Sequence, residues 1–284
     1  MTRLAAFALC IFPSALHACG CIGAVTKCDR LWNSSAVVFL AKAVSSEGLN
    51  QAVSPTLFLS SMAFHFVIQE SFKAAGPVGS EAIVQTGSGG GDCGYPFAIG
   101  QSYLIYADQG PDGRLRTGIC SPTHPAVMAA AVIRELRALR DHKPLDAIFG
   151  IIGQAPRGSG FDSLPEFKPL SGVPVHATSS DGATYSTQTD ASGVFAFASP
   201  SSGDYRVESE LPSGYAPSPA PREVEITTPG FGCRIEQLAR PGGLIQGTVR
   251  NSAGEPLAGF VTVQPANPED ARAARLRGGL PGFT

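Results

Sequence analysis

The sequence of 284 residues predicts a mainly β protein, with a small barrel or sandwich followed by further β modules. Three observations support this fold class. Charged residues make up only 15% of the chain, whereas it holds 33 glycines and 23 prolines, which favours short strands and turns over helical bundles. Runs of alternating apolar and polar residues recur along the chain. A stretch of helical periodicity separates two β-rich parts.

The balance of charge bears on the partners. The formal charge is −2, from 21 basic and 23 acidic residues. Such a chain has no electrostatic reason to bind nucleic acid or an anionic membrane surface. We therefore expect neither as a partner.

Residues 1–18 have the pattern of a cleaved secretory signal, with Arg3, an apolar run over residues 4–12 and a small-residue end at Ala18. The run is well short of the ~20 residues that span a bilayer. Export leads to an oxidising compartment, where cysteines pair. Cys10 leaves with the signal, and the even set that remains is Cys19, Cys21, Cys28, Cys93, Cys120 and Cys233.

The same cleavage region is also similar to a bacterial lipoprotein box that ends at Cys19, with His17 as an unusual residue. In this alternative Cys19 carries lipid and the protein is anchored in the cell envelope. An odd number of thiols then remains, so one cysteine lacks a partner.

The first module is organised around residues 86–107, where glycines surround Cys93 and lead into the apolar run 103–106. Glycine lets the backbone turn tightly or approach another segment closely. Alternation and branched residues predict five short strands with glycine-rich joints, over residues 35–44, 62–68, 81–86, 101–107 and 114–119. We expect a small barrel or sandwich.

A helix is predicted over residues 125–141, because apolar residues share one helical face: Ala129, Val132, Ile133, Leu136 and Leu139. Ser121 or Thr123 can cap it, and Pro125 suits a first turn. On its other faces lie Arg134, Arg137 and Arg140. For these arginines a solvated surface is a better expectation than an anion site.

From residue 148 the composition shifts to Gly, Pro, Ser and short β runs. Strands are predicted over residues 172–175, 184–187, 194–197, 201–207 and 223–227, and the turn Asp190-x-x-Gly193 is predicted to close a hairpin. Residues 154–169 are expected to form an irregular insertion. A second copy begins at Gly243, and because its later strands are missing we expect an incomplete sandwich with a poorly ordered tail.

Several motifs of the first module occur in order: Cys19-Gly20-Cys21, then Cys28, SSAVVFLAKAVS, FHFVIQESFKAAG, TGSGGGDCGYPFAIGQSYLIYA and TGICSPTHP. Over residues 19–140 this pattern resembles the bacterial relatives of tissue inhibitors of metalloproteinases. The resemblance implies a five-stranded OB-like barrel. It also implies that the Cys-x-Cys start is stapled to later cysteines, with Cys19 paired to Cys93 and Cys21 to Cys120. Cys28 is then left for Cys233 or remains free.

In the animal inhibitors that this module resembles, the amine and carbonyl of the mature N-terminal cysteine chelate the catalytic zinc of the protease. Carried over, Cys19 would be that residue, with Gly20 and Cys21 beside it. Gly20 departs from the family pattern, because it has no side chain to fill a specificity pocket. A purely structural half-cystine is the competing interpretation of Cys19, and we favour it.

Residues 148–228, and again 242–265, resemble the carboxypeptidase regulatory-like module, a transthyretin-like β-sandwich. The predicted organisation is therefore a signal over 1–18, an inhibitor-like OB-fold domain with a C-terminal helix over 19–147, a carboxypeptidase regulatory-like sandwich over 148–240, and a partial second sandwich with a tail over 241–284. Neither resemblance supplies catalytic residues.

We predict no catalytic, cofactor or metal site. Residues 89–94 formally satisfy GxGxxG, but residues 95–97 follow in place of the helix that a dinucleotide site needs. Asp92 is expected to form a turn rather than to act as an acid. No GxSxG elbow is present, and no zinc-binding pair is formed by the scattered histidines His65, His124, His142 and His176.

We therefore expect a non-enzymatic bacterial protein that binds an extracellular protein or glycan. It is secreted or periplasmic, or anchored to the membrane if Cys19 is lipidated. Metalloprotease inhibition through Cys19 is the alternative. Glycan binding would need an exposed aromatic cluster, although aromatic residues are more often buried. The candidates for such a cluster are Tyr185, Phe195, Tyr205 and Tyr215.

Overall fold

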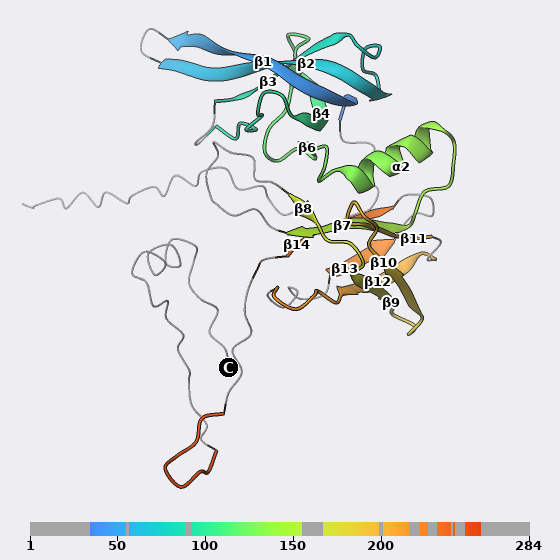
Figure 1. Cartoon of the computed structure of the whole chain (residues 1–284). Coiled ribbons are helices and arrows are strands. Elements are labelled where there is room, and N and C mark those ends of the chain that lie inside the picture. Colours follow the sequence, from blue (N-terminus) through green and yellow to red (C-terminus); the bar gives the residue numbers. More distant parts are fainter. Residues whose placement is uncertain are drawn as a thin grey trace, which may run out of the picture. The chain divides into compact units, whose positions relative to one another are not determined.

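The computed structural model describes residues 35–54, 57–88, 92–154, 167–198, 201–215, 222–226, 232–239, 241 and 248–256. The chain divides into two compact units, Met1–Gly242 and Gly243–Thr284. Several sheets and one helix make up the described part (Figure 1), so the predicted mainly β class is confirmed. No helix among these residues is long and apolar enough to cross a membrane. The predicted signal, residues 1–18, lies outside the described residues.

The first unit begins with a sheet whose pairings close on themselves. Its strands are β1 (Val37–Ser54), β2 (Leu57–Lys73), β3 (Glu81–Gly87), β4 (Ser102–Gln109), β5 (Leu115–Arg116) and β6 (His124–Pro125). β1 pairs with β2, β2 with β3, β3 with β5 in parallel, and β5 with β4, which returns to β1. Five strands therefore form a ring, and β6 pairs with β4 beside it.

The predicted strands over 81–86 and 101–107 are confirmed as β3 and β4. β1 and β2 are far longer than predicted, at 18 and 17 residues, because their polar ends pair with each other where no apolar pattern marks them. The strand predicted over 114–119 is reduced to Leu115–Arg116. It ends there because residues 117–121 form a loop, with the Ser121 N–H donating to the Gly118 carbonyl at 3.0 Å.

Aromatic side chains fill the ring. Phe66 is fully buried and packs edge-on against Phe97 and Tyr103, with ring centroids 5.0 and 6.5 Å away. The hydroxyl of Tyr103 is satisfied, because it accepts the N–H of Ala98 at 2.8 Å. Burial of each such ring contributes roughly 1.5–3 kcal/mol. The ring of strands thus has a core of its own.

The predicted helix is present as α2 (Ala130–Arg140), and its apolar face buries Val132, Ile133 and Leu136. Its predicted start at residue 125 is wrong. Pro125 belongs to β6, and the next residue, Ala126, donates its N–H to the Ser102 carbonyl at 2.8 Å, so the sheet holds this segment. The helix has no side-chain cap, so the caps expected from Ser121 or Thr123 do not form.

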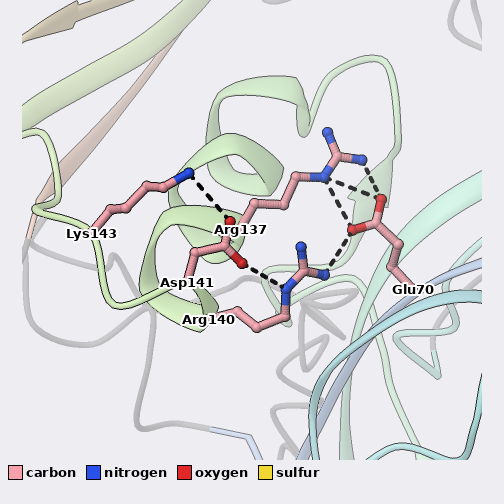
Figure 2. Close-up of polar contacts among 5 residues, drawn as sticks. All are labelled: Glu70, Arg137, Arg140, Asp141 and Lys143. Atoms are coloured by element: carbon pink, nitrogen blue, oxygen red, sulfur yellow. Dashed lines mark hydrogen bonds and ion pairs between the residues drawn. The ribbon is translucent and has the colours of Figure 1, made fainter.

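The arginines of α2 bind carboxylates of the protein itself, although their side chains are about half exposed (Figure 2). Arg137 Nε donates to both oxygens of Glu70 on β2, at 3.1 and 3.0 Å, and Arg137 Nη2 also binds this carboxylate. Arg140 Nη1 donates to Glu70 at 3.3 Å. The hydrogen bond from Arg137 lowers the pKa of Glu70 below its usual value. The pair fastens the helix to the ring.

A two-layer sandwich follows. Its strands are β7 (Ile148–Gln154), β8 (Lys168–Pro169), β9 (Pro174–Ser179), β10 (Thr184–Gln188), β11 (Val194–Phe197), β12 (Gly203–Ser209), β13 (Arg222–Ile226) and β14 (Cys233–Ala239). One sheet has the order β10-β9-β12-β13, and the other has β11-β7-β14 with β8 on β7. Ile148, Val175, Phe195 and Val207 are among the buried residues between them. A strand overlaps each of the five predicted ranges, whereas β7, β8 and β14 were not predicted, and β8 lies at the end of the expected irregular insertion over residues 154–169.

The hairpin predicted at Asp190-x-x-Gly193 is wrong. β10 pairs with β9 and β11 pairs with β7, so this turn carries the chain from one sheet to the other. The turn itself forms, because Gly193 donates its N–H to the Asp190 carbonyl at 2.9 Å and Val194 donates to Asp190 Oδ1 at 3.0 Å. Thr189, only 4% exposed, anchors it by donating to the Leu170 carbonyl at 2.6 Å.

Helix α2 joins the ring to the sandwich by packing against both. Figure 1 shows α2 between the first sheet and strands β7 and β11. A single apolar cluster contains Val38, Leu104 and Tyr106 from the ring, Val132, Ile133 and Leu136 from α2, and Phe149, Ile151 and Val194 from the sandwich. The two modules therefore share buried surface.

A buried carboxylate fixes the link between α2 and β7. Glu135 is 2% exposed and its Oε2 accepts the N–H of Asp146 at 2.9 Å. Arg134 Nη2 lies 3.3 Å from Asp146 Oδ2. Burial raises the pKa of Glu135 above its usual value.

Of the second unit, the structure describes residues 248–256. They contain a turn in which Gly254 donates its N–H to the Asn251 carbonyl at 3.0 Å, and Asn251 Oδ1 accepts the N–H of Glu255 at 2.9 Å. The turn at Asp190 has the same pattern of hydrogen bonds. The rest of the predicted second sandwich and its tail lies outside the described residues.

Candidate functional site

Cys93 lies in the loop after β3, within the glycine-rich stretch singled out in the sequence. Asp92 holds this loop, because its Oδ2 accepts the N–H of Ser88 at 2.6 Å and its Oδ1 accepts the N–H of Gly94 at 3.2 Å. Cys93 has a φ of 60°, which is uncommon for a residue other than glycine. A Cβ on Gly94 would overlap the backbone of Gly87. The turn-forming role of Asp92 and the close approach at a glycine are both confirmed.

The loop that carries Cys120 packs against Cys93. Ile119 donates its N–H to the Cys93 carbonyl at 3.0 Å, and a Cβ on Gly118 would lie 2.8 Å from the same oxygen. These loops follow β3 and β5, which run parallel, so both begin at the same edge of the sheet. Two of the predicted half-cystines therefore belong to adjoining segments.

Cys233 starts β14 and is fully buried, with its Sγ 3.7 Å from the Glu225 carbonyl. None of Cys93, Cys120 and Cys233 is without a partner. The other members of the predicted site, Cys19, Gly20, Cys21 and Cys28, lie outside the described residues. The pairings and the chelating role of Cys19 therefore stay predictions.

A cavity of about 680 Å³ opens beside the first half of β3. It is lined by β1, β2, the loop between β2 and β3, β3, and the turn between β4 and β5 with the strand residues at its two ends. The apolar part of the wall comes from Val37, Phe39, Ile68, Ile83 and Leu115, together with small residues such as Ala36, Ala75 and Ala82. Its polar residues are Glu47, Glu81, Gln85, Gln109 and Arg114.

The charges around this cavity are partnered unequally. Arg114 Nε lies 3.9 Å from Asp112 Oδ2, and Glu47 lies 3.8 Å from His65. Within the described part of the chain, the carboxylate of Glu81 has neither a hydrogen bond nor an ion pair. A cationic group that enters the cavity would therefore meet an available carboxylate.

A polar cluster joins β6 to β14. His124 Nε2 lies 3.2 Å from Glu236 Oε2, and Arg234 Nη2 lies 2.6 Å from the same oxygen. Burial alone would raise the pKa of Glu236, but the hydrogen bond with His124 and the charge of Arg234 outweigh it and lower this pKa. The nearby Tyr106 hydroxyl is buried without a hydrogen-bond partner among the described residues, and burial raises the pKa of Tyr106. The cluster adds charge to the apolar contact between ring and sandwich.

The histidines noted in the sequence stay apart. His65 faces Glu47, His124 belongs to the polar cluster, and His176 Nδ1 lies 2.9 Å from Ser186 Oγ. Across the described ranges, no group of three His, Cys, Asp or Glu side chains could hold a metal ion.

The aromatic residues considered for glycan binding do not form an exposed cluster. Phe195 and Tyr205 are 2% and 3% exposed and belong to the sandwich core. Tyr185 packs on that core with its ring centroid 6.2 Å from that of Tyr205. The Tyr215 hydroxyl donates to Gln154 Oε1 at 3.4 Å. The alternative expectation, that these aromatics are core or turn residues, fits these positions.

Sequence reasoning missed the cavity and the cluster around Glu236. The cavity combines residues from β1 to β5, the loop after β2 and the turn between β4 and β5, which together form no local motif. Glu236 lies on β14, whose alternation is too short and too polar to stand out. Its one visible signal was the pair Arg234 and Glu236 at strand spacing.

No protein-family model matches the chain, and no curated protein matches it. Among solved structures it is similar to the TIE protein of Bacillus anthracis, at 10% identity and a TM-score of 0.27, over 79% of this chain and 41% of that one. The C-terminal fragment of the pilus adhesin SpaC from Lactobacillus rhamnosus GG has 13% identity and a TM-score of 0.28, over 74% and 91%. The minor pilin GBS52 of Streptococcus agalactiae has 12% identity and a TM-score of 0.29, over 76% of this chain and 87% of that one. The chain spans less than half the length of the TIE protein. Similarity at this level carries no argument about function.

Proposed function

We propose that the protein is a non-enzymatic binding protein, secreted or held at the cell envelope, that binds an extracellular partner in the open cavity of the ring. The cavity is the observation that carries this proposal. Its volume of about 680 Å³ is within the usual range of ligand sites, and its wall combines apolar and polar surface in nearly equal parts.

We also propose that the ring is the OB-like barrel implied by the resemblance to metalloproteinase inhibitors. The closed order β1-β2-β3-β5-β4 supports this assignment. In OB folds, strands 2 and 3 and the loops between strands 1 and 2 and strands 4 and 5 commonly form the binding face. The cavity is lined here by β2, β3 and the turn between β4 and β5, which belong to that face, and also by β1 and the loop between β2 and β3. The two sheets that follow support the proposal of a transthyretin-like sandwich.

Parallel screens test the binding function. The full chain is offered a glycan array and a phage library of random linear peptides, with Arg114→Glu and Ala75→Trp as cavity variants. Val78→Trp is the matched control, because Val78 is 68% exposed in the neighbouring loop and does not line the cavity. We expect a ligand whose binding falls about tenfold or more in both cavity variants and not in the control. The proposal would be refuted if both cavity variants bound the ligand as tightly as the unchanged chain, or if neither screen gave a ligand.

Metalloprotease inhibition is the second candidate, and the contact between Cys93 and the loop of Cys120 favours it. The thiols of a Cys-x-Cys start are separated by two residues, roughly 7 Å of extended chain. Adjoining segments are suitable anchors for both, so the pairings Cys19–Cys93 and Cys21–Cys120 would hold the mature amine at this edge of the barrel.

The inhibitor hypothesis is tested with a mature protein that begins at Cys19 and a version with one extra residue before it. Inhibition of a panel of zinc proteases by the first and not by the second would support it, because chelation needs a free amine. Disulfide mapping and intact mass check the premise. A lipidated start, or pairings other than those proposed, would exclude it.

A further inference from the structure

We infer that the cavity takes an extended peptide, which adds a strand to the free edge of β3. This inference rests on the proposed function and names the class of partner. It depends on a part of the ring that β5 leaves uncovered.

β5 is too short to cover β3. The ladder between them consists of Val84 with Leu115 and Gln85 with Arg116. The chain turns before β5, where Gly110 donates its N–H to the Arg114 carbonyl at 2.8 Å. Among the residues the structure describes, the segment 81–83 therefore pairs with a strand on one side only, with β2.

The backbone of this segment points to the open side. Ser80 accepts the N–H of Ile68 at 3.0 Å, so Ser80 faces β2. Alternate residues of an antiparallel strand face the partner, so Ala82 faces β2 whereas Glu81 and Ile83 direct their N–H and C=O groups away from it. Gln85 has the same orientation as Ile83, because its carbonyl accepts the N–H of Thr117 in the loop after β5, at 3.0 Å.

The cavity occupies the place where β5 would continue. Residues 81–83 line one side of it and residues 113–115 line the other. The edge is accessible, since Glu81 is exposed and Ile83 is 48% exposed. Three residues of strand span roughly 10 Å, so a short extended segment fits the uncovered edge. Strand addition of this kind gives affinity through main-chain hydrogen bonds and specificity through alternate side chains.

The wall indicates the side chains of the peptide. The small residues Ala75 and Ala82 line the cavity together with the apolar residues Phe39 and Ile68, which suits an apolar side chain of medium size. The unpartnered carboxylate of Glu81 favours a Lys or Arg beside it, whereas Arg114 already faces Asp112.

A peptide is favoured over a glycan. Sugar rings are commonly held against exposed aromatic faces. Phe39, the one aromatic residue in the described lining, is fully buried.

The experiment takes peptides enriched from the phage library, synthesises them and measures their affinity for the full chain. Each peptide is also made with single backbone N-methyl groups along its length. N-methylation at alternate positions should weaken binding about tenfold, because those N–H groups bond to β3, and the intervening positions should tolerate it. Ile83→Pro, which removes an N–H from the free edge, should weaken binding similarly.

Charge provides the second measurement, and it uses a variant that is expected to fold normally. Glu81→Lys should lower the affinity for peptides that contain Lys or Arg several-fold. Glu210→Lys, at a side chain that is 70% exposed on the sandwich, is the matched control and should change nothing.

The outcomes separate the two proposals. Strand addition is overturned if the affinity shows no alternation along the N-methyl series. It is also overturned if Glu81→Lys does not change the affinity for peptides that contain Lys or Arg. A glycan that binds and is lost in Arg114→Glu overturns the peptide class but leaves the cavity as the binding site. Absence of any binder, as expected if the chain's own residues before Ser35 fill the cavity, overturns both.

Discussion

Leu136→Ala tests whether the ring and the sandwich fold as one body. Leu136 is 5% exposed and belongs to the apolar cluster that includes residues of the ring, α2 and the sandwich. A buried Leu→Ala substitution costs about 2–5 kcal/mol, because it removes apolar contacts and leaves a cavity. A domain is stabilised by only about 5–15 kcal/mol in total, so the effect is easily measured.

The assay combines urea denaturation, followed by circular dichroism, with hydrogen exchange followed by mass spectrometry. Because the cluster is shared, peptides from β2 and from β12 should lose protection by the same free energy, within about 0.5 kcal/mol. Leu139→Ala is the matched control on the same helix. Leu139 is 43% exposed, so its truncation should cost less than about 1 kcal/mol.

Loss of protection in one module alone would refute this reasoning. The ring and the sandwich would then be separate folding units in contact, and the domain boundary predicted between residues 147 and 148 would also be a boundary of cooperativity. Equal effects of Leu136→Ala and Leu139→Ala would instead show that the cluster contributes little.

Three further substitutions test local features. Glu70→Gln removes the carboxylate that Arg137 binds and should lower the free energy of unfolding by about 1 kcal/mol at neutral pH. Since the folded pKa of Glu70 lies below its ordinary value of 4.5, this difference is present above that pH and is lost as pH falls through the lowered pKa, which urea midpoints at about pH 7 and pH 3 would measure. Gly94→Ala forces a Cβ against the backbone of Gly87 and should cost about 1–3 kcal/mol in urea. Thr189→Val removes a buried hydroxyl that donates to the chain and should cost about 1–3 kcal/mol, most of which Thr189→Ser should restore in the same assay.

Each of these predictions has its own control. Glu223→Gln should leave the free energy of unfolding nearly unchanged at neutral pH, because that side chain is exposed on β13 and has no ion pair among the described residues. Gly48→Ala should be tolerated, since a Cβ there meets nothing within 4 Å. A Thr189→Ser variant as unstable as Thr189→Val would contradict the role of the hydroxyl.

The local sequence pattern was enough to predict where most strands lie, but it did not predict which strands pair. β12 and β13 alternate clearly, and each lies within two residues of its predicted range, whereas β9 begins two residues later than predicted and ends four residues later. β14 was missed because its support is distant: it pairs in parallel with β7, about 85 residues earlier in the chain. The turn at Asp190 was recognised, but its hydrogen bonds are local and carry no information about which sheet the next strand joins.

The candidate site was predictable only in its loops. The glycines and Asp92 around Cys93 predict a tight turn, and the structure contains this turn. The cavity exists because β5 begins only at Leu115, after the turn between Gly110 and Arg114, and therefore leaves residues 81–83 of β3 without a second strand among the described residues. No residue of its wall is unusual by itself.

The shared apolar cluster around α2 has a consequence for ancestry. A ring of strands that gained this sandwich by gene fusion would first have exposed the outer face of its helix, and only later substitutions at positions such as Phe149 and Val194 would have covered it. Once that face was covered, neither half could be exchanged for another module without exposing this apolar surface to water. Lineages that carry this pair should therefore inherit the two halves together.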